Sequence, residues 1–193
     1  MGSALTTGPS AQLFTSARLE RVFEACFVRD FRTRLVGGAA EPLYRPATEG
    51  QPESIIYYRE DYFASALHEV AHWCIAGQAR RRQLDFGYWY APDGRSPQQQ
   101  KAFESVEYQP QALEWFFSKA CGVRFRISVD NLHGLTGDVD DASDFARRVM
   151  AQAQHWQREL LPPRAQSFFQ ALCVEFGTQA KLADLEFTQA ELA

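Results

Sequence analysis

An H-E-x-x-H segment formed by His68, Glu69 and His72 lies within a mostly apolar run of the chain. Two histidines four residues apart share one face of an α-helix, so both imidazoles can reach the same divalent metal ion. The run has an acidic start at Glu60 and a basic end at Arg82, and this charge order complements a helix dipole. The sequence therefore predicts a helix from about Glu60 to Arg82 that carries a metal site.

An apolar stripe flanks the histidine face of this predicted helix. Its members are Ala64, Leu67, Ala71, Cys74 and Ile75. Because such a stripe packs against the core, the two imidazoles should point toward the protein interior. The alternative interpretation is a pair of core histidines held by hydrogen bonds. A third ligand is what distinguishes a metal site from this alternative.

A metal ion held by two histidines needs at least one more protein ligand, commonly a carboxylate. Candidate carboxylates follow at Glu104, Glu107 and Glu114. If residues 103 to 117 are helical, Glu107 and Glu114 share a face, with Gln111 between them. We expect Glu107 to be the third ligand, with Glu104 as the second choice. For a single glutamate, the ordinary role is a solvated surface charge.

The spacing of the histidines leaves two kinds of chemistry open. With zinc, the arrangement is that of a zincin-type metallopeptidase, in which Glu69 acts as general base toward metal-bound water. With iron(II), two histidines and one carboxylate form a facial triad with open positions for oxygen and substrate. Glu69 is thus essential in a hydrolase but only a neighbour of the metal in an oxygenase.

Length, charge and cysteine usage restrict the class of protein. A chain of 193 residues with 46% hydrophobic content can bury a substantial core. Its net charge of -4 and the lack of a long Lys/Arg block argue against direct nucleic-acid binding. The four cysteines form no C-x-x-C pair, which favours free thiols in a reducing compartment. No run of about 18 apolar residues occurs, so we expect a cytoplasmic protein without a membrane partner.

The pattern of apolar residues predicts an α+β fold, with residues 13–193 as a single compact catalytic domain after a disordered tail at 1–12. Further helices are predicted at Ser16 to about Arg29, Gln111 to Ala120, Ser143 to about Leu160 and Pro163 to about Phe176. Strands are predicted at Ile55 to Tyr58, Leu84 to Tyr90 and Val123 to Val129, with loops at 37–52 and 134–141. Because the first strand directly precedes the histidine helix, that zincin-like helix should pack on a small sheet.

Other segments extend the pattern on both sides of the histidines. They are Asp30-Phe31, Thr33–Leu35, Glu41-Pro42, Tyr62–Leu67, His68–Gly77, Ala79–Arg81, Asp85–Tyr90, Pro92–Arg95, Phe103-Glu104, Val106-Glu107, Pro110–Leu113, Trp115 and Asp130–Leu132. Together they closely resemble the elongation factor P hydroxylase family, in consistent order from about Asp30 to Leu132. This joint pattern is far more specific than H-E-x-x-H alone. The chain beyond about Val149 shows no such match.

The resemblance implies a non-haem iron(II) monooxygenase that uses molecular oxygen. Its substrate would be a lysine of translation elongation factor P to which other enzymes have already attached a β-lysyl group. The implied metal ligands are His68, His72 and a glutamate, which we assign to Glu107. A requirement for 2-oxoglutarate stays open. An iron-dependent hydroxylase is thus the leading hypothesis, and a zinc-dependent metallopeptidase with Glu69 as base is the alternative.

Substrate contacts are expected from the stretch after the histidine helix. Alternation places Tyr88 and Tyr90 on one face of a strand, where they could line a channel for a long modified lysine. Asp93 could pair with a substrate ammonium, although a Pro-Asp-Gly turn also accounts for this residue. Three arginines could bind an acidic group, namely Arg95, Arg124 and Arg126. Arg95 is the one that we place among the substrate-binding residues.

Overall fold

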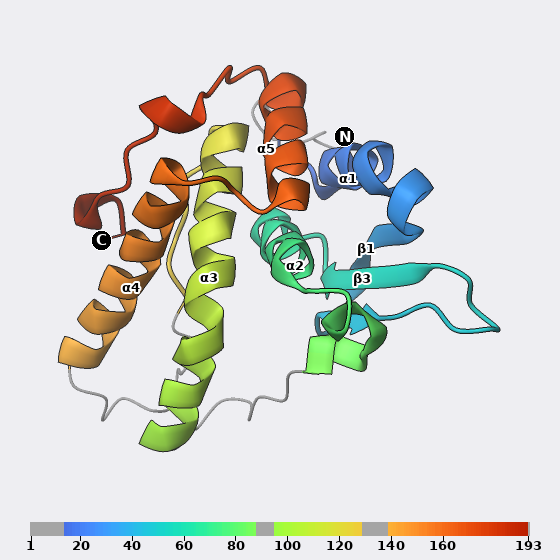
Figure 1. Cartoon of the computed structure of the whole chain (residues 1–193), viewed down its shortest axis with the longest axis horizontal. Coiled ribbons are helices and arrows are strands. Elements are labelled where there is room, and N and C mark those ends of the chain that lie inside the picture. Colours follow the sequence, from blue (N-terminus) through green and yellow to red (C-terminus); the bar gives the residue numbers. More distant parts are fainter. Residues whose placement is uncertain (1–13, 88–94, 129–138, 193) are drawn as a thin grey trace, which may run out of the picture.

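The computed structural model describes residues 14–87, 95–128 and 139–192, and in these residues a small sheet lies at one side of a group of helices (Figure 1). The helices are α1 (Ser16–Phe31), α2 (Phe63–Ile75), α3 (Pro97–Cys121), α4 (Val139–Arg158) and α5 (Pro163–Phe176). The strands are β1 (Thr33–Ala39), β2 (Leu43–Arg45) and β3 (Ser54–Arg59). Short 3-10 turns follow at Arg80–Arg82, Leu84–Gly87, Leu182–Asp184 and Gln189–Leu192. The predicted tail at 1–12 lies outside the described residues.

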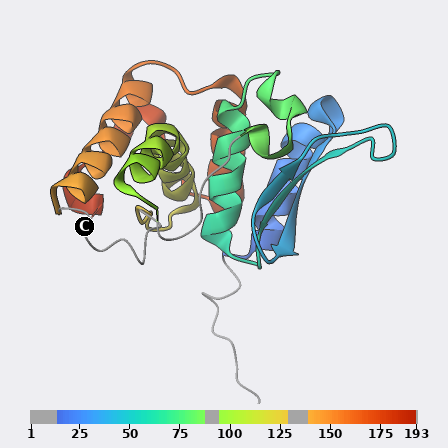
Figure 2. The ribbon, with the colours of Figure 1, turned by 90° about the horizontal axis from the view of Figure 1, so that it is seen from below.

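The sheet has the strand order β1-β3-β2, with β1 parallel and β2 antiparallel to β3. Leu35 and Tyr44 both pair with Ile56, and all three side chains are buried. Since paired residues share a face of a sheet, these side chains form its core-facing side. Figure 2 shows α2 between this sheet and α3, in agreement with the contacts of α2 to both. The prediction of a mixed fold with the histidine helix on a small sheet is confirmed, whereas its zincin-like character stays a prediction.

Strand β2 and the end of β1 lie in the stretch 37–52 that the sequence predicts to be a loop, so that part of the prediction was wrong. The glycine pair at Gly37 and Gly38 forms an irregularity within β1, where the register with β3 shifts between Val36 and Ala39. Gly38 adopts a φ of 81°, which glycine reaches without strain. A glycine pair in a sequence is compatible with either a bulge or a turn. Here β1 continues its parallel pairing with β3 beyond the glycines, so the pair forms a bulge.

Gly37 is needed because its backbone lies against a buried tyrosine. A Cβ atom at this position would be 2.5 Å from Tyr58 Oη and 3.0 Å from the carbonyl oxygen of Glu60. The Tyr58 hydroxyl donates a hydrogen bond of 2.8 Å to Glu20 Oε1, and the N–H of Gly37 donates one of 3.0 Å to the same oxygen. The tyrosine ring therefore has little freedom to move away.

We expect Gly37→Ala to lower the free energy of unfolding by about 2 kcal/mol, because the added methyl group overpacks this contact. For a protein of this size, the melting temperature should fall by about 6 °C. Thermal and urea unfolding measure both quantities. Gly50→Ala is the control, since a Cβ there meets no atom within 4 Å. Equal stability of the two variants would contradict the packing argument.

Helix α2 is shorter than predicted at both ends. Glu60 adopts a positive φ of 46°, so the helix begins only at Phe63. At the other end, the backbone leaves the helical conformation at Ala76. The side chain of Arg81, in the following 3-10 turn, then folds back and donates a hydrogen bond of 2.8 Å to the carbonyl oxygen of Ala76. A basic residue thus does stabilise the C-terminus of α2, but it lies in the 3-10 turn that follows and not in the helix itself.

Helix α3 begins much earlier than predicted, at Pro97 instead of near Gln111. Ser96 and Gln99 form a capping box, in which the N–H of Gln99 donates to Ser96 Oγ and the N–H of Ser96 donates to Gln99 Oε1. Pro110, predicted to start the helix, is accommodated within it. Its end at Gly122, with a φ of 74°, is confirmed. The glutamates of the predicted site therefore lie on one continuous helix.

Two predicted strands are wrong within the described residues. The segment 123–128 has no strand partner there, although its alternation is correct, with Phe125 buried and its neighbours Arg124 and Arg126 exposed. Its backbone instead bonds to a side chain. The Ser128 N–H donates to Gln111 Oε1 at 3.0 Å, and Gln111 Nε2 donates to the Ser128 carbonyl oxygen at 2.7 Å. The other predicted strand begins as a 3-10 turn at Leu84–Gly87, and the rest of it lies outside the described residues.

The remaining helices follow the sequence prediction closely. Helices α1 and α5 have the expected bounds to within a few residues, and α5 ends at Gly177, which has a φ of 68°. Helix α4 starts at Val139, where the sequence predicts a loop. None of the described helices is long and apolar enough to cross a membrane. That residues 13–193 form one catalytic domain stays a prediction.

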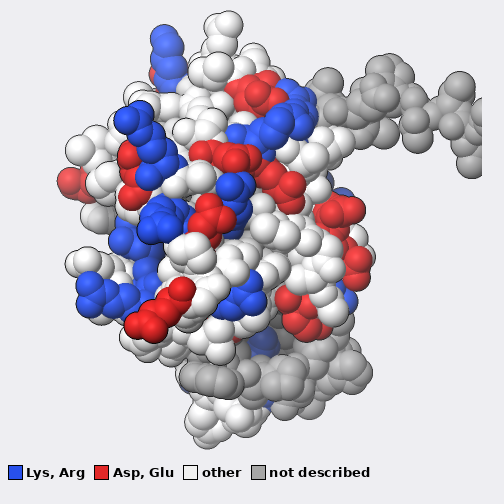
Figure 3. Space-filling model, turned by 90° about the vertical axis from the view of Figure 1, so that its right-hand side faces the viewer, with Lys and Arg blue, Asp and Glu red and all other residues white. Residues whose placement is uncertain are grey.

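The face of the molecule in Figure 3 carries acidic and basic side chains that alternate over its surface. Arg34 illustrates their pairing, because its guanidinium lies 2.9 Å from Glu24 and 2.8 Å from Glu53. These ion pairs connect β1 to α1 and to the segment before β3. Exposed pairs of this kind add little to stability.

Candidate metal centre

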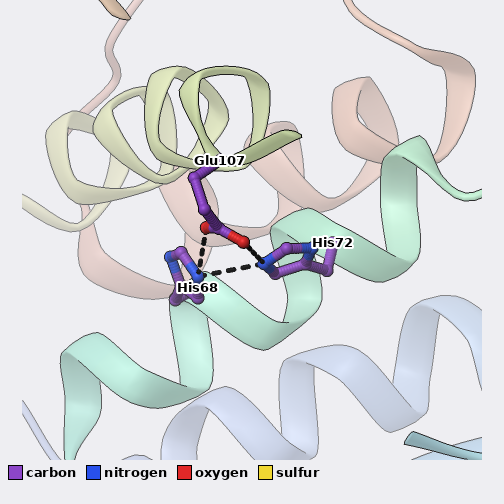
Figure 4. A group of neighbouring side chains, drawn as sticks. All are labelled: His68, His72 and Glu107. Carbon is purple, nitrogen blue, oxygen red and sulfur yellow. Dashed lines mark hydrogen bonds and ion pairs between the residues drawn. The ribbon is translucent and has the colours of Figure 1, made fainter. Parts of the chain in front are cut away.

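His68 and His72, one turn apart on α2, face Glu107 of α3 (Figure 4). The two Nε2 atoms are 3.0 Å apart, and the two carboxylate oxygens of Glu107 lie 3.3 Å from one Nε2 atom each. Glu107 is only 3% exposed. We refer to these three residues as the candidate triad.

The spacing of the candidate triad suits a divalent transition-metal ion. Bonds of about 2.1 Å separate two ligand atoms by about 3.0 Å at right angles and by about 3.4 Å at the tetrahedral angle. The distance of 3.0 Å between the two Nε2 atoms falls within these limits, and so does the distance of 3.3 Å from each Nε2 atom to one oxygen of Glu107. Two imidazoles and one carboxylate are also a donor set that iron(II) and zinc both accept. The residues present therefore fit such an ion.

Charges in the centre shift the pKa values of its residues in opposite directions. Burial acts to lower the pKa of His68, but the carboxylates of Glu107 and Glu114 outweigh it and raise this pKa well above its usual value. Burial opposes ionisation of Glu107, yet His72 and His68 hold its pKa well below the usual range. Burial raises the pKa of Glu69 and of Glu114, and the imidazoles counteract it. His68 and Glu107 thus stabilise each other's charged form.

The other two predicted glutamates of α3 have different positions. Glu104 accepts a hydrogen bond of 3.0 Å from Gln100 Nε2, and it is not part of the group of possible metal ligands found in the described residues. Glu114 Oε2 lies 2.9 Å from His68 Nδ1, the ring nitrogen that faces away from Glu107. Of the three glutamates, the structure thus brings Glu107 to the Nε2 atoms of both histidines.

A cavity of about 430 Å³ contains the candidate triad. Its other lining residues are Glu41, Pro42, Arg59, Ala64, Ser65, Glu69, Asp85, Phe86, Phe103, Gln111, Glu114, Arg126 and Ser128. The lining combines residues from α2 and α3 with residues from turns and from the segment before the undescribed residues 129–138. Carboxylates outnumber arginines in this lining, so the cavity favours positively charged groups.

One wall of the cavity comes from a turn that the sequence analysis missed. Asp85 and Phe86 adopt positive φ values of 51° and 55°, which are uncommon for residues other than glycine. Asp85 Oδ1 accepts a hydrogen bond of 3.1 Å from the Tyr44 N–H, and the Phe86 ring stacks on Tyr44 at a centroid distance of 4.2 Å. Phe86 also lies parallel to His72, 6.4 Å away. The signal in the sequence was Gly87, which favours a left-handed turn over a strand.

The predicted substrate contacts are only partly within the described residues. Tyr88, Tyr90 and Asp93 lie outside them. The guanidinium of Arg95 lies 3.9 Å from the ring centroid of Phe103, which lines the cavity. Among the arginines proposed to bind an acid, Arg126 lines both this cavity and a second depression, whereas Arg124 lines only the second one.

Two helices present two histidines and a glutamate to a cavity, and these residues form a candidate two-histidine, one-carboxylate metal site. The family model for elongation factor P hydroxylase matches residues 22–187. The elongation factor P lysine hydroxylase of Haemophilus influenzae is 44% identical to this chain over 158 residues, which is 82% of this chain and 87% of the relative. This chain therefore belongs to the elongation factor P hydroxylase family. The match also extends well beyond Val149, where the sequence analysis found none.

Proposed function

We propose that this chain is an iron(II)-dependent hydroxylase that acts on the β-lysylated lysine of elongation factor P and uses molecular oxygen. The observation that carries the proposal is the candidate triad of His68, His72 and Glu107 in a cavity. Membership of a family with a relative named as a lysine hydroxylase of this factor supports the reaction. The expected location of such an enzyme is the cytoplasm, where translation factors act.

The residues of the cavity have distinct parts in this reaction. Iron(II) held by two imidazoles and one carboxylate would supply oxygen activation, in which one oxygen atom enters a C–H bond and the other leaves as water with two electrons from an external reductant. His68 and His72 would hold the ion, and Glu107 would balance part of its charge. Phe86 and Phe103 are almost fully buried beside the triad. Their rings restrict the access of water to the place where a C–H bond must lie.

The charge of the cavity also supports a lysine substrate. A β-lysylated lysine carries ammonium groups at neutral pH. Glu41 and Asp85 lie in the cavity lining, outside the candidate triad. Such carboxylates attract an ammonium group and orient the long side chain that carries it. We propose that this charge complementarity directs the modified lysine to the metal.

Intact-mass analysis of β-lysylated elongation factor P tests the proposal. The factor is incubated with the iron-loaded chain, oxygen and a two-electron chemical reductant, and metal occupancy is measured in the same sample. We expect the factor to gain one oxygen atom and to gain none with His72→Ala. An unchanged mass at full metal occupancy would show that the proposed reaction is wrong.

Replacing Glu69 by glutamine separates the proposed oxygenase from a zinc peptidase. As a general base, Glu69 would contribute a factor of about 100 to 10,000 to the rate, and Glu69→Gln would lose it. An oxygenase does not need this base, so we expect Glu69→Gln to retain hydroxylation within about tenfold of the wild type. Hydroxylation rates are compared at equal metal content. A loss of a hundredfold or more with metal retained would assign Glu69 a direct part in the chemistry.

A further inference from the structure

Glu114 contacts the side of His68 that faces away from the rest of the candidate triad. Its Oε2 atom is 2.9 Å from His68 Nδ1, whereas His68 Nε2 faces His72 and Glu107. The two nitrogens of one imidazole thus have separate partners on α3, two helical turns apart. An imidazole that donates its Nδ1–H to a carboxylate keeps Nε2 unprotonated, which is the form that binds a metal ion.

The position of Glu114 in the fold strengthens this interpretation. Its neighbours in sequence, Leu113 and Trp115, are fully or almost fully buried, and Glu114 itself is only 8% exposed. A carboxylate at such a place destabilises a fold unless a partner compensates for its lost hydration. His68 is the partner that the structure gives it. The desolvation cost of the Glu114 carboxylate is better explained by a role at the metal centre than by a role in core packing.

We propose that Glu114 is a positioning residue for the metal centre, an inference that rests on the proposed function because it requires a metal ion at the triad. Glu114 selects the tautomer of His68 and fixes the orientation of its ring. Its negative charge also makes the imidazole a stronger donor to a cation. Glu114 lies at Nδ1 of His68, on the side away from the Nε2 atom of the triad, so its effect would pass through His68.

Two variants separate the hydrogen bond from the charge. Glu114→Leu removes both, whereas Glu114→Gln keeps an oxygen that can accept the Nδ1–H of His68. Groups of this kind contribute about 10-fold to 100-fold to metal affinity. We expect Glu114→Leu to weaken iron(II) and cobalt(II) binding by about 100-fold and Glu114→Gln by about 10-fold. The absorption spectrum of bound cobalt(II) should change in Glu114→Leu, because the His68 ring is no longer held.

Metal affinity is measured by competition with a chelator, and stability by urea unfolding of the metal-free chain. Glu114→Leu removes one partner of the buried pair with His68, so the metal-free chain is expected to lose stability, and the metal affinity of the folded protein is the deciding measurement. A purely structural role for Glu114 would lower stability and leave the metal affinity of the folded protein unchanged. If Glu114→Leu does not fold, the comparison rests on Glu114→Gln, for which wild-type affinity would overturn the inference.

Two controls distinguish this inference from the proposed function. Glu175→Gln alters a partly buried carboxylate that bonds to Arg18 at 2.8 Å, and it should keep wild-type metal affinity. His72→Ala should bind no metal tightly. If His72→Ala loses the metal and both Glu114 variants keep wild-type affinity, only the inference about Glu114 fails. If His72→Ala binds metal as well as the wild type, the proposed metal centre fails, and the inference fails with it.

Discussion

Glu107→Gln is expected to abolish tight binding of iron(II) and, with it, hydroxylation of elongation factor P. The carboxylate of Glu107 is the only one in the described residues that groups with both histidines as a possible metal ligand. Loss of a ligand should weaken binding by more than the roughly 10-fold to 100-fold that residues around the ligands contribute. Iron content after desalting, together with a chelator competition, measures the effect.

Glu104→Gln is the matched control, because it changes a glutamate on the same helix, one turn earlier. Glu104 has Gln100 as its hydrogen-bond partner, so we expect this variant to retain the metal and the reaction. The sequence alone left both glutamates possible as the third ligand. If Glu104→Gln loses the metal and Glu107→Gln retains it, Glu104 and not Glu107 is the third ligand.

The second large effect is expected at the C-terminal end of α2, which Arg164 of α5 holds. One nitrogen of this guanidinium, Nη2, lies 2.9 Å from the Trp73 carbonyl oxygen, 3.0 Å from that of Cys74 and 2.6 Å from that of Ala76. The guanidinium also lies 4.8 Å from the Trp73 ring centroid. Burial lowers the pKa of Arg164, and the partial negative charge of the helix end compensates for burying its charge.

We expect Arg164→Met to lower the free energy of unfolding by about 3 kcal/mol, because the carbonyl groups at the helix end lose a charged donor. The melting temperature should fall by about 9 °C. Metal affinity should fall as well, since Trp73 and Cys74 directly follow His72. Urea and thermal unfolding, with iron titration, measure these effects.

Arg82→Met is the control for this prediction. Arg82 is an exposed residue of the 3-10 turn at Arg80–Arg82, and its replacement should change stability by less than about 0.5 kcal/mol. A similar loss of stability in both variants would mean that general surface charge, and not the capping of α2, is responsible.

The sequence was most informative where a short-range pattern decides the structure. The spacing of His68 and His72 requires only one helical turn, and the glycine at the end of α5 requires only its own backbone conformation. The heptad spacing of Glu107 and Glu114 could place both on one helix face, but it could not decide between them as ligands. The structure brings the three residues of the candidate triad together, as the sequence predicted.

Features that depend on distant parts of the chain could not be predicted in this way. Strand β1 contains two glycines, and only its pairing with β3 reveals that it is a strand. Segment 123–128 alternates like a strand, yet Gln111 provides its hydrogen bonds. The turn at Asp85 and Phe86 depends on Tyr44, which is far away in the sequence. No local pattern shows any of these partners.

The role of Glu114 lies between these two cases. Its place on the same face as Glu107 follows from helical periodicity, and it was considered as a possible ligand. Whether Glu114 is a metal ligand or a partner of the ligand His68 depends on which imidazole nitrogen of His68 it contacts. That choice is set by the packing of α2 against α3, which the sequence does not specify.

The most direct test of the proposed chemistry is the origin of the oxygen atom in the product. Iron-loaded protein, β-lysylated elongation factor P and a two-electron reductant are incubated in ordinary water under heavy-isotope oxygen gas, and the modified lysine is analysed by mass spectrometry. An oxygenase centred on His68, His72 and Glu107 predicts the heavy isotope in the new hydroxyl group. A hydroxyl oxygen that comes from water, or a lysine that gains no oxygen at full metal occupancy, would contradict it.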